Sequence, residues 1–131
     1  MRALTILTAA CVGAAWLGTR PAFAQPGYSG EGDFQVFCTS CHGATAKGDG
    51  PIAKSLVKRP PDLTRLSARN NAVYPQDQVF KSIDGRGAHN NPDMPAWNEV
   101  FAKAQESTGP EAAKARIMAL VEYLKSIQEK H

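Results

Sequence analysis

The chain has 131 residues, with 15 Lys plus Arg and 12 Asp plus Glu, which gives a formal net charge of +3 at pH 7. Binding to nucleic acid depends on the neutralisation of many phosphates, so a charge this close to neutral disfavours a nucleic-acid partner. The length suits one small domain with a core of moderate size.

Residues 1–24 show the order of features found in a secretory signal peptide. Arg2 supplies a positive start, residues 3–18 carry no charge, and Ala22-Phe23-Ala24 is a small-x-small cleavage site. The alternative is an uncleaved anchor, but the apolar run is near the lower limit for about 30 Å of hydrocarbon. We therefore expect a cleaved signal peptide, export to the periplasm, and a mature domain at residues 25–131 with no transmembrane segment.

The mature chain begins with a helix predicted over residues 30–39. Phe34, Phe37 and Cys38 are spaced at i, i+3 and i+4, so one face of this helix is apolar. That face leads directly into Cys38-Thr39-Ser40-Cys41-His42, which is a C-x-x-C-H pattern.

The C-x-x-C-H pattern indicates covalent attachment of a c-type haem. Each of the two thiols can add to one vinyl group of the haem, and the imidazole of His42 is then held beside the iron as an axial ligand. A thioredoxin-like pair would need a βαβ pattern, and a zinc site would need a second ligand pair; the sequence offers neither. A plain disulfide between Cys38 and Cys41 stays open, although it leaves His42 without a role. We expect one covalent haem c per chain.

The motif and the helix before it resemble a class I monohaem cytochrome c. In that family a glycine lies eight residues before the first haem cysteine and an aromatic residue lies four before it, and Gly30 and Phe34 occupy those positions. The resemblance covers essentially the whole mature chain. It implies an all-α cytochrome c fold, in which the N- and C-terminal helices cross closely around a covalently bound haem.

A glycine-rich loop over residues 43–51 follows the motif. It lacks the G-K-[ST] of a phosphate-binding loop. In the resembled family a proline carbonyl in this loop accepts a hydrogen bond from Nδ1 of the proximal histidine, which makes Pro51 the candidate; the alternative is a simple turn.

Residues 58–64 are predicted to be extended, because paired prolines disfavour a helix. Arg59 or Arg65 is a candidate for contact with a haem propionate, and the alternative for each is solvated surface.

A second informative loop covers residues 85–97, with two glycines, two asparagines and two prolines. Met94 lies between the two prolines, and a thioether held in stiff backbone suits the sixth ligand of the iron. In the resembled family a Met-Pro pair supplies that ligand, and the pair here matches it. The rivals are His89 and Met118. Trp97 is expected either to donate its indole N–H to a propionate or to pack on the haem.

Two further helices are predicted from apolar periodicity. One covers residues 75–84 and ends at Gly85. The other covers residues 111–129 and has the clearest apolar stripe in the chain. In the resembled family the last helix crosses the first through a leucine and an aromatic residue three positions apart, and Leu120 and Tyr123 fit that pair.

These features predict a periplasmic one-electron carrier, with His42 and Met94 on opposite faces of the iron. Because both axial positions are filled, no coordination site is open to a substrate, and we expect no enzyme activity. The partners would be redox proteins that dock through a small, transient interface. The lysines that are candidates for steering acidic partners are Lys47, Lys54, Lys58, Lys81 and Lys103. A haem c subunit of a periplasmic dehydrogenase or reductase stays open, as does a sensor or peroxidase with an open sixth site.

Overall fold

The computed structural model describes residues 29–87, 92–104 and 109–130, and within these ranges the fold is helical with no strand. This confirms the all-α prediction. The five α-helices of the described residues are α1 (Gly30–Phe37), α2 (Thr39–His42), α3 (Gln76–Asp84), α4 (Trp97–Ala104) and α5 (Gly109–Ser126). Three short 3₁₀ turns, η1 (Ala53–Ser55), η2 (Leu63–Arg65) and η3 (Ala68–Asn70), lie between α2 and α3.

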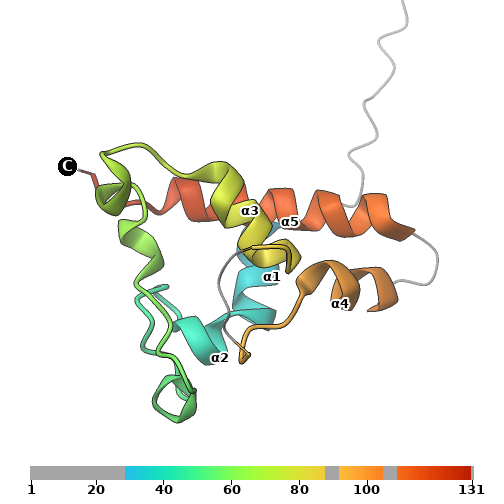
Figure 1. The fold of residues 1–131 in the computed structure, drawn as a ribbon, viewed down its shortest axis with the longest axis horizontal. Coiled ribbons are helices and arrows are strands. Elements are labelled where there is room, and N and C mark those ends of the chain that lie inside the picture. The colour runs from blue at the N-terminus through green and yellow to red at the C-terminus, as the bar shows by residue number, and fades with distance from the viewer. Residues whose placement is uncertain (1–28, 88–91, 105–108, 131) are drawn as a thin grey trace, which may run out of the picture.

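The helices pack together while the segment between α2 and α3 extends to one side (Figure 1). The closest helix pairs are α4 with α5, α1 with α5, and α3 with α5, so α5 is the element that the other three share. None of the helices that the structure describes is long and apolar enough to cross a membrane.

The first helix begins at a side-chain cap and ends inside the cysteine motif. The Ser29 hydroxyl accepts a hydrogen bond from the Gly32 N–H at 3.2 Å, and acidic residues in the first turn favour the helix dipole. The helix was predicted to continue to Thr39, but α1 ends at Phe37 and the one-turn helix α2 begins at Thr39. Cys38 therefore lies at the junction between the two helices.

The predicted crossing of the first and last helices is confirmed. A Cβ atom on Gly30 would overlap the carbonyl oxygen of Ala119, so only glycine permits this approach. Beside it, the rings of Phe34 and Tyr123 pack with their centroids 5.4 Å apart, and Leu120 is fully buried. The last helix was predicted over residues 111–129 and its observed bounds are shifted by two or three residues at each end.

Helix α4 was not predicted. It has an apolar face formed by Trp97 and Phe101 at i and i+4, with Phe101 1% exposed and packed in the core. That spacing is helical and is the signal by which this helix could have been predicted from the sequence. The helix matters for the site because Trp97, its first residue, follows closely on Met94.

A buried ion pair joins α5 to α1. The Arg116 guanidinium donates to both carboxylate oxygens of Asp33, at 2.6 and 2.9 Å, and both side chains are about nine-tenths buried. The guanidinium also lies over the Phe101 ring, 4.1 Å from its centroid. Arg116 thus brings α1, α4 and α5 together, because its charge is satisfied only when all three are in place.

Candidate functional site

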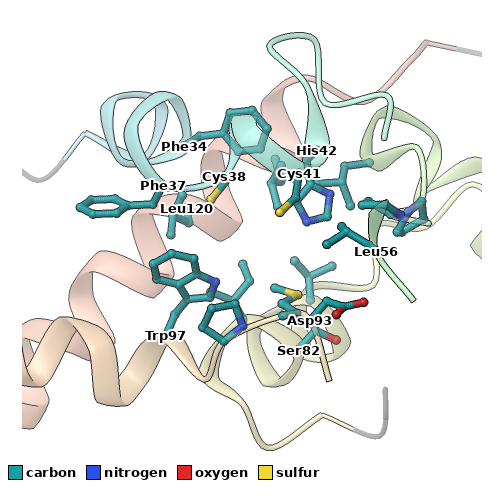
Figure 2. A pocket seen from close by; sticks show the side chains of 18 of the residues that line it. Phe34, Phe37, Cys38, Cys41, His42, Leu56, Ser82, Asp93, Trp97 and Leu120 are labelled. Atoms are coloured by element: carbon teal, nitrogen blue, oxygen red, sulfur yellow. The ribbon is translucent and has the colours of Figure 1, made fainter. Parts of the chain in front are cut away.

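An apolar cavity of about 330 Å³ lies between the helices and the extended segment, open on one side. Its walls come from α1, the cysteine motif, residues 56–66, α3, residues 93–97 and α5. Figure 2 shows Phe34, Phe37, Cys38, Cys41 and His42 along one side of this cavity, with Ser82, Asp93 and Trp97 across from them. The cavity is therefore enclosed by segments from both halves of the chain.

The two cysteines of the motif are half-buried free thiols on the cavity wall. Burial, followed by the charges of Asp33 and Cys41, raises the pKa of the Cys38 thiol to about 12. A catalytic C-x-x-C thiol has a lowered pKa, because the thiolate is the reactive form. The electrostatics around Cys38 thus disfavour the thioredoxin-like alternative and suit a neutral thiol that anchors a group.

His42 ends α2 and lines the same cavity. Burial lowers the pKa of its imidazole, so the ring is neutral at pH 7, which is the form that ligates metals. Its Nδ1 atom is buried and has no hydrogen-bond partner. The hydrogen bond predicted from this atom to the Pro51 carbonyl is therefore not formed here, and Pro51 is exposed and does not line the cavity.

Met94 lines the cavity from the segment before α4 and is half-buried. Figure 2 shows Asp93, its neighbour in sequence, across the cavity from His42. Of the two rivals, Met118 is 39% exposed on α5 and does not line the cavity. His89 lies outside the described residues. The structure thus brings the imidazole of His42 and the thioether of Met94 to one cavity from segments far apart in sequence.

Trp97 belongs to an aromatic cluster at one end of the cavity. Its ring centroid lies 5.7 Å from that of Phe37 and 5.3 Å from that of Phe101. Because Trp97 and Phe37 also line the cavity, the cluster offers ring surface on which a flat apolar group can pack. The donor role predicted as an alternative for the indole N–H stays a prediction.

The two arginine candidates differ in position. Arg59 lines the cavity, and its Nε donates to the Gly48 carbonyl at 3.4 Å. Arg65 is exposed, lies 3.6 Å from the Glu129 carboxylate, and does not line the cavity. Lys58, which was predicted as one of the lysines that steer acidic partners, is a further basic lining residue. Arg59 and Lys58 are therefore the basic side chains placed to meet the acidic groups of a ligand.

The side chains around the cavity fit a haem. The lining is mostly apolar and carries two free thiols, a neutral imidazole with a buried, unpartnered nitrogen, and a thioether. The described residues contain no group of three or more His, Cys, Asp and Glu side chains that could hold a bare metal ion. An all-helical domain with two thiols, an imidazole and a thioether on one apolar cavity is typical of a c-type cytochrome.

Comparison of the chain with known protein families agrees with its assignment to the c-type cytochromes. Residues 29–128 match the family model described as Cytochrome c, which covers most of the chain, and the chain belongs to this family. Its cofactor is covalently bound haem c, and its general function is haem-based electron transfer. Neither the curated proteins nor the solved structures contain a match.

Proposed function

We propose that this protein is a periplasmic one-electron carrier, and that residues 1–24 are a signal peptide removed from a mature domain at residues 25–131. The observation that carries the proposal is the cavity lined by His42 and Met94, two neutral side chains of the kind that fill both axial positions of haem iron. With both positions filled, no site on the iron is left for a substrate, and the protein is not an enzyme.

Each residue of the site has a distinct role in this proposal. Cys38 and Cys41 would hold the haem through two thioether bonds, each formed by addition of an S–H group to a vinyl group, so that the sulfur and the hydrogen end on its two carbons. His42 and Met94, on the cavity lining, would hold the iron. Haem iron bound there supplies exchange of a single electron between Fe(II) and Fe(III).

The open side of the cavity is the place where a partner would dock. Lys58 and Arg59 line the cavity, and Lys47, Lys54, Lys81 and Lys103 are exposed elsewhere on the described surface. Positive charge around a site of electron exchange steers an acidic partner and raises the rate at which the two proteins associate. The partners are therefore redox proteins with an acidic face, which bind through a small interface.

Substitution of Met94 tests the closed iron site. Ferrous Met94→Ala, with haem attached, should bind carbon monoxide readily, because the sixth position loses its ligand. Met118→Ala is the matched control, since this methionine is on the surface of α5 and outside the cavity. It should bind carbon monoxide no better than the wild type. Retention of native low-spin methionine ligation in Met94→Ala would refute the assignment.

A further inference from the structure

The residue before Met94 makes a contact that links two loops of the cavity wall. The Asp93 carboxylate oxygen Oδ2 accepts the backbone N–H of Val57 at 2.7 Å and that of Lys58 at 3.4 Å. These donors are 36 and 35 residues away in sequence. A carboxylate that accepts backbone N–H groups makes charge-assisted hydrogen bonds, which are stronger than neutral ones.

Both segments joined by this contact lack regular secondary structure. Residues 56–61 lie between the 3₁₀ turns η1 and η2, and residues 92–96 precede α4. Leu56, Lys58, Met94 and Pro95 all line the cavity, so the contact lies on the wall where the two segments meet. Figure 2 shows Leu56 and Asp93 near one another at the edge of the cavity.

Met94 is held from its other side by close packing. Ala96, two residues later, contacts the end of α3 so closely that a Cβ on Gly85 would overlap its side chain. Gly85 has φ +98°, which favours glycine, and it caps α3. The segment carrying Met94 is thus attached to α3 through Ala96 and to residues 57–58 through Asp93.

We propose that Asp93 is a positioning residue that keeps the Met94 thioether on the haem iron by bonding its carboxylate to the backbone N–H groups of Val57 and Lys58. This inference rests on the proposed His42 and Met94 ligation. Loss of the carboxylate removes the attachment of the methionine segment to residues 57–58 and leaves the contact of Ala96 with α3 and the packing of Trp97 in place. The thioether then spends more time off the iron, and an external ligand competes for the sixth position more easily.

The test is a titration of the ferric, haem-loaded protein with imidazole, followed by the loss of the near-infrared sulfur-to-iron band. Asp93→Ala should raise the apparent affinity for imidazole about tenfold, the size expected from losing one charge-assisted hydrogen bond. Asp93→Asn should give a smaller rise of about threefold, because its amide oxygen remains a neutral acceptor.

Asp62→Ala is the matched control. The Asp62 carboxylate also accepts a backbone N–H, that of Thr64 at 2.9 Å, but it does not line the cavity. This variant should stay within about twofold of wild-type imidazole affinity. An equal rise in Asp62→Ala and Asp93→Ala would mean general loosening and would overturn the positioning role.

Further outcomes of the imidazole titration also test the positioning role of Asp93. Wild-type affinity in both Asp93 variants would overturn the positioning role while leaving the methionine ligation intact. If Asp93→Ala cannot be recovered with haem, Asp93→Asn decides alone, a rise of about threefold supporting the role and an unchanged affinity contradicting it. Absence of the sulfur band in the wild type would contradict the proposed function itself, before any Asp93 variant is compared.

Discussion

Tyr74 attaches the segment before α3 to the last helix through one hydrogen bond. Its hydroxyl donates to the Val121 carbonyl at 2.9 Å. Burial, followed by the negative charge of Glu122, raises the pKa of Tyr74 above its usual range. The folded chain therefore keeps this proton at a pH where the unfolded chain has released it, and stability falls as the pH rises above about 10.

Tyr74→Phe should change this pH dependence. At pH 7 the variant loses about 1 kcal/mol of stability with the hydrogen bond. Between about pH 9 and pH 11 its stability should decline less than that of the wild type, because the group that must ionise is gone. Urea unfolding of the haem-loaded protein at both pH values measures this. An alkaline decline equal to that of the wild type would contradict the account.

The predicted residue roles rest on chemistry that is local in sequence and on the resemblance. Cys38, Cys41 and His42 form one short motif, and the signals for Met94 were its flanking prolines and the Met-Pro pair of the resembled family. The contact of Asp93 with Val57 and Lys58 could not be predicted from the sequence, because it joins residues that are 36 and 35 positions apart. The Pro51 role came from the resemblance alone, and His42 Nδ1 lacks that bond here.

The crossing of α1 and α5 depends on one glycine. Gly30→Ala should push the two helices apart, because the added methyl overlaps the Ala119 carbonyl, at a cost of about 1–3 kcal/mol. Gly32→Ala is the control in the same helix, where the new Cβ meets only Ser29 at 3.5 Å. It should be neutral or stabilise by up to about 1 kcal/mol. Urea unfolding of the haem-loaded variants measures both, and equal effects would contradict this packing.

Helices could be predicted from the sequence where the apolar periodicity and the capping residues indicate the same bounds. The helices over α1, α3 and α5 were predicted with end errors of at most three residues, and Gly85 ends α3 as expected. Helix α4 has only eight residues and follows a proline-rich loop, so Trp97 and the buried Phe101 did not stand out as a helical face. The Arg116 and Asp33 pair was also missed, because a buried charge is recognisable only once its partner is in place.

At the scale of the whole molecule, the cavity is continuous with the hydrophobic core, because Phe34, Val79, Ile83, Leu120 and Leu124 belong to both. Haem bound in the cavity removes this apolar surface from water, which stabilises the folded chain. We therefore expect the stability of the fold to depend on the haem.

Removal of both thiols tests this dependence. Cys38→Ser with Cys41→Ser should abolish covalent haem, and once haem is stripped the chain should lose near-ultraviolet circular dichroism and cooperative unfolding. Ser40→Ala, an exposed change inside the same motif, should keep both haem and fold. A haem-free double variant that unfolds cooperatively would contradict the dependence.

The overall architecture was predicted mainly through the resemblance to cytochromes c. Periodicity alone predicted helices, but the crossing at Gly30 and Tyr123 required a family pattern, since nothing local to either helix encodes its partner. The position of Arg59 at the cavity and of Arg65 away from it depended on the path of residues 56–66.

The most direct test of the central claim, a closed iron site formed by His42 and Met94, is the visible and near-infrared spectrum of the wild-type protein purified with its haem. The account predicts a weak sulfur-to-iron band in the ferric form and no reaction of the ferrous form with carbon monoxide. A ferric spectrum without that band, together with ready binding of carbon monoxide, would contradict it and would favour a sensor or an enzyme with an open iron.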